Sequence, residues 1–445
     1  MGAIRNRLLL TTSCRVCLRA SSLQPMNSSR QRTRQAEALK ERPPSQPKRS
    51  FHTKRVGRHY KPFQEGAPFY INGLHSPCLE NSSVSGASCG SRVKDSRKVH
   101  NPDREFVTPP FAWPDFSLIS GFKEPCNSFF VKFLNGGTIP ISTSRGCPYE
   151  CTFCSVIKTF GRKWRAQDPN RVIEEIQHQM DVMKTRSVFF VDDNFALDRN
   201  RAKQILRGII RECLDIDIIT QVRAEAARDE ELLELMQEAG VFYVAVGFES
   251  VNPNSLRAYK KGLNVEETFQ SIALFHKYGI RVHGMFVVGC DEDDAETIRK
   301  TVDYSIQYNL DSVHYLAIMP LPGTELTCAM EENGVIFSYN YDLYNSHYVT
   351  YYPKKMRPST LQKEVTLAHR RFYSYGNILR TLWRGKGLNH VKFMLIGHFL
   401  NAKLNKQQFV YQEKLEQMEE SLSGHGKSLL LSQEVPFHNK WQMNG

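Results

Sequence analysis

The chain has 445 residues, of which 41% are hydrophobic, so it is long enough to bury a substantial core. Its formal net charge is +13, but residues 1–60 alone carry +12 of it. Because the remainder is nearly neutral, nucleic-acid binding by the folded body is disfavoured. No apolar stretch reaches the roughly 20 residues that span a bilayer, so we expect a soluble protein without a membrane span.

Residues 1–105 are rich in Arg, Ser, Pro and Gly and show no sustained apolar period. We therefore expect a disordered basic tail and loop in this region. The Arg-rich, acid-poor start has the composition of an organelle transit peptide, but a disordered basic extension fits equally well. The location stays open between the mitochondrial matrix and the cytoplasm.

From residue 106 to 326 the pattern is that of alternating strands and amphipathic helices. Asp168 and Asp198 are placed to cap two of the helices, and Gly240 to end a third. Near-continuous apolar strands separated by helices predict an α/β fold with a parallel sheet, a partial (β/α)6 TIM-like barrel. The six expected strands are 139–142, 188–191, 216–222, 242–246, 282–288 and 312–318.

Residues 327–425 are predicted to be a mostly helical extension, followed by a tail over 426–445. Ser359 and Gln362 have the spacing of a capping box that would open a helix reaching about Leu382. Two more helices are expected over 391–404 and 408–422. The apolar run 391–400 is too short to span a bilayer and favours a buried helix.

Three cysteines follow the first strand with the spacing Cys-x3-Cys-x2-Cys: Cys147, Cys151 and Cys154. Thiolates on one tight loop can hold three irons of a cubane and leave the fourth iron open. A structural zinc site needs four ligands, and no second Cys or His pair follows. The motif therefore predicts a 4Fe-4S cluster.

With this motif and the barrel pattern, residues 109–326 resemble the radical S-adenosylmethionine (SAM) superfamily. The resemblance implies that SAM chelates the open iron and that an electron from the cluster cleaves it to a 5′-deoxyadenosyl radical. It also implies an electron donor such as ferredoxin or flavodoxin. The substrate is not indicated.

The resemblance assigns the remaining site residues to positions after successive strands. Phe153 would pack near the adenine, and Asp192 or Asp193 would hold the methionyl amino group, although many family members have Gly-Gly-Glu there. Ordinary packing for Phe153 and a plain turn for Asp193 are the competing interpretations. The other assigned residues are Gln221 and Arg223 for the ribose and carboxylate of SAM, Glu249 as a catalytic carboxylate at the barrel mouth, and Gly289 beside the adenine.

The segments 161–165, 192–195 and 320–324 are most similar to the branch that usually carries an N-terminal cobalamin-binding domain. No Asp-x-His-x-x-Gly signature is found, so cobalamin binding within this chain is not expected; either the protein works without it or the sequence lacks its front. We expect an enzyme of methyl transfer or C–C bond formation. The alternative is a non-catalytic iron-sulfur or RNA-binding protein on the same scaffold.

Overall fold

The computed structural model describes residues 113–119 and 137–424, and our predictions for residues 1–105 and 426–445 lie outside these ranges. Its centre is a parallel sheet of six strands in the order β1-β4-β5-β6-β7-β8. The sheet stays open because its edge strands β1 and β8 do not pair. All six predicted strands form: β1 (Ile139–Ile141), β4 (Ser187–Phe190), β5 (Asp217–Val222), β6 (Val241–Glu249), β7 (Arg281–Val288) and β8 (Ser312–Ala317).

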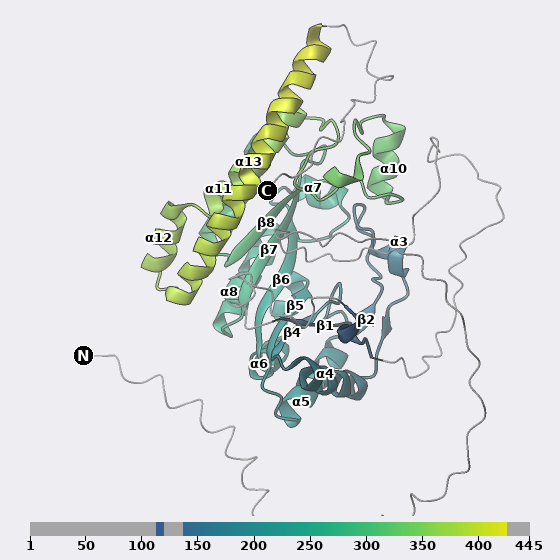
Figure 1. Cartoon of the computed structure of the whole chain (residues 1–445), viewed down its shortest axis with the longest axis vertical. Helices are drawn as coiled ribbons and strands as arrows, with labels where there is room; N and C mark the ends of the chain where they lie inside the picture. The colour runs from purple at the N-terminus through teal and green to yellow at the C-terminus, as the bar shows by residue number, and fades with distance from the viewer. Residues whose placement is uncertain (1–112, 120–136, 425–445) are drawn as a thin grey trace, which may run out of the picture. The chain divides into compact units, whose positions relative to one another are not determined.

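Helices connect successive strands, which confirms the α/β partial barrel (Figure 1). Asp168 caps α4 by accepting the N–H of Asn170 at 2.9 Å, and Asp198 caps α5 by accepting the N–H of Arg201 at 3.0 Å. The 3-10 helix η1 (Phe116–Leu118) precedes β1. The helices between the strands are α3 (Val156–Phe160), α4 (Pro169–Met183), α5 (Arg199–Arg211), η2 (Ala224–Arg228), α6 (Glu230–Glu238), α7 (Pro253–Ala258), α8 (Val265–Lys277) and α9 (Ala295–Gln307).

Aromatic side chains fill the space between the sheet and α8. Phe248 stacks on Phe269 with ring centroids 5.1 Å apart, and Phe286 stacks on Tyr315 at 5.5 Å. All four side chains are fully buried, so each contributes a large apolar area to the core. This face is therefore packed solid, and polar chemistry is left to the strand ends.

The C-terminal region is helical as predicted, but its boundaries differ from the prediction. It contains α10 (Glu325–Glu332), η3 (Tyr341–Leu343), α11 (Pro358–Phe372), α12 (Tyr375–Trp383) and α13 (Leu388–Gly424). The single helix predicted to reach Leu382 is divided into α11 and α12, because Ser374 caps a new helix. The two helices predicted over 391–404 and 408–422 are one continuous helix, α13. None of the described helices has the length and apolar character required to cross a bilayer.

The predicted capping box is wrong. The N-cap of α11 is Arg357, with Pro358 in the first turn. Ser359 donates its hydroxyl to Glu419 at 2.7 Å, while Gln362 bonds the backbone at His347 and Val349. Both side chains serve tertiary contacts, which outweigh a local cap.

Helix α11 covers the open edge of the sheet at β8. The hydroxyl of Tyr373, just beyond the helix, accepts the N–H of Val313 at 3.1 Å and donates to its carbonyl at 3.2 Å. His369 Nε2 accepts the N–H of Tyr315 at 3.2 Å. The unpaired edge groups that would otherwise invite another strand are thus satisfied by side chains.

A histidine cluster lies between β7, β8 and α11. Its members are His283, His314, His347 and His369. Four pairs of these rings have centroids 5.1 to 6.2 Å apart. Burial lowers the pKa of all four, to about 4 for His347 and about 3 for His369. The cluster is therefore neutral at physiological pH.

Candidate active site

The three cysteines lie on the loop after β1, at the carboxyl end of the sheet. Cys147, Cys151 and Cys154 are all half-buried, and the N–H of Cys154 donates to the carbonyl of Cys151 at 3.1 Å. Burial raises the pKa of the Cys147 thiol, and the nearby charges of Asp193 and Cys151 raise it further. The pKa of Cys154 is raised to about 11 by burial first, and by Cys151, Asp193 and Cys147. The structure thus brings together the three predicted ligands.

A short hairpin fixes how the chain enters this loop. β2 (Ser144–Arg145) pairs antiparallel with β3 (Arg165–Ala166). Between β2 and Cys147, Gly146 has φ +89°, and a Cβ there would lie 2.5 Å from the carbonyl oxygen of Lys163. Only glycine fits such a position, so the backbone conformation just before Cys147 is fixed.

The far side of the loop is tied to two later elements. Thr152 donates its N–H to the carbonyl of Tyr259 at 3.3 Å, and its own carbonyl accepts the N–H of Leu326 at 3.0 Å. The Phe153 ring meets the edge of the Tyr259 ring with centroids 5.1 Å apart. Phe153 is half-buried beside the cysteines, where its predicted contact with adenine stays a prediction.

These thiols suit a cluster better than a single ion. Among the described residues no three His, Cys, Asp or Glu side chains converge on the position of one metal ion. In a cubane each thiolate binds a different iron, so the thiols need to be neighbours without sharing one point. Cys151 raises the pKa of both Cys147 and Cys154, so the three sulfur atoms are neighbours.

The two predicted acids after β4 have different environments. Asp192 is buried and accepts the N–H groups of Thr143 and Ser144, both at 2.7 Å, as well as the Thr143 hydroxyl. Burial raises its pKa to about 6. Asp193 is exposed and lies close enough to Cys147 to raise the pKa of that thiol. Asp192 therefore holds the backbone segment that leads into the cysteine loop, and Asp193 lies near the cysteines.

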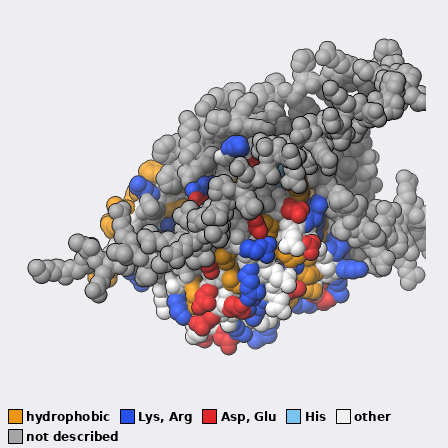
Figure 2. Space-filling model, turned by 90° about the horizontal axis from the view of Figure 1, so that it is seen from below, with side chains coloured by type: hydrophobic (Ala, Val, Ile, Leu, Met, Phe, Trp, Pro, Cys, Tyr) orange, Lys and Arg blue, Asp and Glu red, His pale blue; other side chains and the backbone are white. Residues whose placement is uncertain are grey.

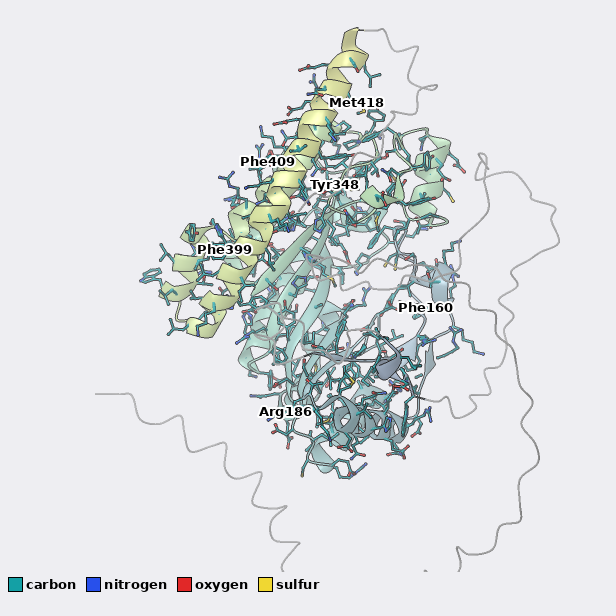
Figure 3. All side chains as sticks on the ribbon, in the orientation of Figure 1. Phe160, Arg186, Tyr348, Phe399, Phe409 and Met418 are labelled. Atoms are coloured by element: carbon teal, nitrogen blue, oxygen red, sulfur yellow. The ribbon has the colours of Figure 1, made fainter. Side chains whose placement is uncertain are left out.

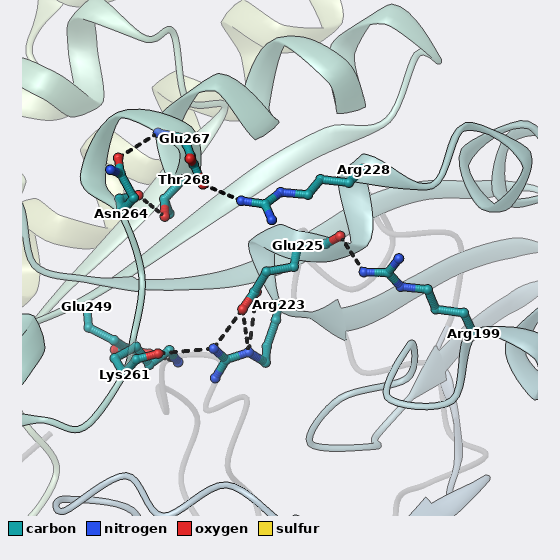
Figure 4. A network of polar contacts seen from close by, with 9 residues as sticks. All are labelled: Arg199, Arg223, Glu225, Arg228, Glu249, Lys261, Asn264, Glu267 and Thr268. Atoms are coloured by element: carbon teal, nitrogen blue, oxygen red, sulfur yellow. Dashed lines mark hydrogen bonds and ion pairs between the residues drawn. The ribbon is translucent and has the colours of Figure 1, made fainter.

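Arg223 follows β5 and connects three parts of the site (Figure 4). Its guanidinium bonds Glu225 at 2.8 Å and the carbonyl of Lys261 at 3.2 Å. It also lies 4.1 Å from the centre of the Tyr149 ring, which belongs to the cysteine loop. The predicted contact with the SAM carboxylate would therefore require Arg223 to share its donors with Glu225.

Glu249, at the end of β6, forms a buried ion pair with Lys261. The two charged atoms are 2.7 Å apart, and the side chains are 8% and 9% exposed. Burial lowers the pKa of Lys261, but Glu249 and Cys151 raise it above its usual value overall. Glu249 has φ +63° at a bulge in β6, a strained conformation that is typical of functional sites. Sequence analysis did not identify Lys261, which lies on the loop between α7 and α8.

The remaining predicted positions lie at the ends of β5 and β7. Gly289 has φ +93° and no room for a Cβ beside Tyr351 and Leu361; its N–H donates to Asp293 at 2.9 Å and its carbonyl accepts the Tyr351 hydroxyl at 2.6 Å. Gln221 is half-buried on β5. Sequence analysis did not single out Asn194 as a ligand, yet its Oδ1 is buried with no partner among the described residues.

Residues 141–304 match the family model of the Radical SAM superfamily. The chain is 28% identical to an uncharacterized methyltransferase of Pyrococcus horikoshii, over 58% of this chain and 55% of that protein. It is 27% identical to bacteriochlorophyllide d C-12(1)-methyltransferase of Chlorobaculum tepidum, over 58% and 56% of the two chains. It is 28% identical to the anaerobic magnesium-protoporphyrin IX monomethyl ester cyclase of Cereibacter sphaeroides, over 55% and 40%.

Among solved structures, the radical SAM methyltransferase TsrM of Kitasatospora setae is similar at 23% identity and a TM-score of 0.42, covering 44% of this chain and 40% of that one. The chain spans about half the length of the curated relatives it matches. The matched segment contains all three cysteines and all the strand ends described above except that of β8. The chain therefore carries a radical SAM domain over residues 141–304.

Proposed function

We propose that this protein is a radical SAM enzyme in which Cys147, Cys151 and Cys154 bind a 4Fe-4S cluster. The observation that carries the proposal is the meeting of three thiols on one loop at the carboxyl end of a parallel sheet. When bound, the cluster supplies the electron that reductively cleaves SAM. Three protein ligands leave one iron for SAM, and the loop is anchored by Gly146 and Thr152.

The charged groups around the loop supply the SAM contacts in this proposal. Asp193 presents a carboxylate toward the cysteines and would attract the methionyl ammonium group, while Asp192 holds the loop beneath it. Arg223 would bind the methionyl carboxylate with the donors it now gives to Glu225. The unpartnered Asn194 Oδ1 is a further acceptor for a polar group at this strand end.

The apolar and uncharged groups would position the rest of SAM. Phe153 offers a ring face for the adenine, with Gly289 allowing close approach at the end of β7. Gln221 offers an amide to the ribose. Glu249 would act as a catalytic carboxylate if a proton must be moved, with Lys261 keeping its buried charge compensated.

The relatives named as methyltransferases and as a cyclase support methyl transfer or C–C bond formation as the type of reaction. An electron donor such as ferredoxin or flavodoxin would reduce the cluster.

Anaerobic reconstitution with iron and sulfide tests the proposal. The wild type should hold about four irons per chain and, with dithionite, convert SAM to 5′-deoxyadenosine or S-adenosylhomocysteine. Cys151→Ala should lose both properties, and Cys213→Ala, which removes an exposed cysteine far along the chain, should keep both. One tightly bound zinc, or a cluster that leaves SAM intact with every reductant, would contradict the proposal and favour an iron-sulfur or RNA-binding protein.

A further inference from the structure

The second half of the C-terminal region has a charge pattern unlike the rest of the folded chain. Residues 365–412 contain eight Lys and Arg and no Asp or Glu. By contrast, the lower face of the molecule shows acidic and basic side chains intermixed (Figure 2). Elsewhere in the folded chain, Lys203 and Arg207 pair with Glu231. Helix α12 and the first half of α13 thus present a cationic surface, whereas the second half of α13 carries Glu413, Glu416, Glu419 and Glu420.

The same segment exposes large apolar side chains. On α12, Tyr375, Leu379, Leu382 and Trp383 follow the i, i+4, i+7, i+8 spacing that places residues on one helix face. Trp383 is 89% exposed and Leu379 is 65% exposed. Singly exposed apolar residues are ordinary, but a whole face of them calls for a partner.

Helix α13 continues this surface. At 100° per residue, six of its exposed residues fall within an arc of about 60°. Leu388 and Phe399 are 70% and 66% exposed, and Figure 3 labels Phe399 on the half of α13 next to α12. The six residues are Leu388, Lys392, Phe399, Lys403, Lys406 and Val410.

The cations of this stripe are available to bind a ligand. Lys392, Lys403 and Lys406 form no ion pair with any residue that the structure describes, and neither does Arg380 on α12. A cavity of about 300 Å³ lies beside the stripe between α11 and α13, lined in part by Arg370, His398 and Lys406. The wall of this cavity is mostly apolar, and the Lys and Arg side chains that form no ion pair among the described residues are complementary to anionic headgroups.

We propose that the α12–α13 surface, made of these apolar and basic side chains, binds the surface of a membrane that contains anionic phospholipids. Trp, Phe and Leu side chains would enter the boundary between headgroups and acyl chains, while Arg and Lys contact the phosphates. The helices would lie on the membrane, and α3, which follows the cysteine loop, lies on the other side of the sheet from α12 (Figure 1).

The charge of the surface argues against two other occupants. In a symmetric dimer that packs the acid-free stretch on itself, cations would face cations across the interface. The segment 1–60 carries +12 and would be repelled in the same way. An anionic lipid surface is complementary to the patch in both its charge and its apolar content.

Sedimentation of the full chain with vesicles tests the proposal. We expect binding to vesicles of phosphatidylcholine and phosphatidylglycerol in equal parts, and little binding to phosphatidylcholine alone. Replacing Leu379 and Trp383 together by Ser should reduce the bound fraction about tenfold. Tyr341→Ser, at a side chain that is 66% exposed on η3, is the matched control and should bind as the wild type does.

A second pair of variants tests the charge. Lys392→Glu with Lys403→Glu should abolish the preference for anionic vesicles, whereas Lys363→Glu, outside the acid-free stretch, should leave it intact. Binding should weaken as salt shortens the Debye length to about 3 Å near 1 M, and free phosphate at a matched ionic strength should not compete.

Three results would overturn the proposal: no binding to either vesicle, equal binding to both, or a dimer in solution that the Leu379 and Trp383 changes dissociate. The dimer would show that a second copy covers the surface. None of these variants touches the cysteine loop, so iron content and SAM cleavage serve as independent measures of folding.

Discussion

At the carboxyl ends of the strands Glu249 and Lys261 form a buried ion pair, whereas the four buried histidines beside β7 and β8, under α11, are neutral. Glu249 and Lys261 are 2.7 Å apart with both side chains nearly inaccessible to water. His347 and His369 are also buried, but their pKa values are lowered far enough to keep them uncharged. The strand ends thus contain charged groups that can interact with a charged ligand, whereas the histidine region covers the edge of the sheet with neutral side chains.

Unpairing the buried charge should give the largest effect. Lys261→Met leaves Glu249 buried without its cation, so the free energy of unfolding should fall by about 3 to 5 kcal/mol. Urea denaturation at pH 7 measures this. Lys260→Met is the matched control, since Lys260 pairs with Glu325 at the surface and should cost less than about 1 kcal/mol.

Adding Glu249→Gln to Lys261→Met should restore part of the lost stability, because the uncompensated charge is removed. A double variant as unstable as Lys261→Met would mean that the cost comes from packing and that the two regions do not differ as described.

Replacing Asp192 tests the strand ends at the backbone segment that leads into the cysteine loop. Asp192→Asn keeps an oxygen for the N–H groups of Thr143 and Ser144, which both donate to Oδ1, but puts an amide NH2 where Oδ2 accepts the Thr143 hydroxyl, so we expect a loss of about 2 kcal/mol. Reconstituted protein should also retain less iron, since the cysteine loop loses its anchor. Asp193→Asn, at an exposed side chain, should change the free energy of unfolding by less than about 0.5 kcal/mol.

Lowering the pH should act on the neutral region. A histidine whose folded pKa lies below its unfolded value of about 6.5 binds its proton mainly after unfolding, so stability is lost as the pH falls below 6.5 toward 4 for His347 and 3 for His369. From pH 7 to pH 5 each of these two histidines should lower the free energy of unfolding by about 2 kcal/mol. His347→Gln should flatten this dependence, and an unchanged slope would place the protonation elsewhere.

The difference between the regions also explains what the sequence could predict. Each of the six strands is largely apolar, and Asp168 and Asp198 are of a residue type that favours helix N-termini. The three cysteines are recognisable because their spacing lies within eight residues of one loop. These features are local, so a pattern along the chain is enough to find them.

Features that depend on distant contacts were not predictable. Lys261 is one of two adjacent lysines on a loop, and only the fold separates the buried one from the exposed Lys260. Gln408 was predicted to begin a separate helix, but it lies inside α13, where it is buried and donates to the carbonyl of His347. Ser359 and Gln362 have the spacing of a capping box, but Ser359 donates to Glu419 and Gln362 donates to the carbonyl of His347.

The edge of β8 should give the smallest effect. Tyr373→Phe removes the hydroxyl that bonds both backbone groups of Val313, so we expect a loss of about 1 kcal/mol, the net value of a typical hydrogen bond. Faster exchange of the Val313 amide hydrogen would locate the loss at the edge. Tyr375→Phe, at an exposed side chain two residues on, should change neither quantity. If Tyr373→Phe costs as much as Lys261→Met, the neutral cover of β8 is as important to the fold as the ion pair at the strand ends.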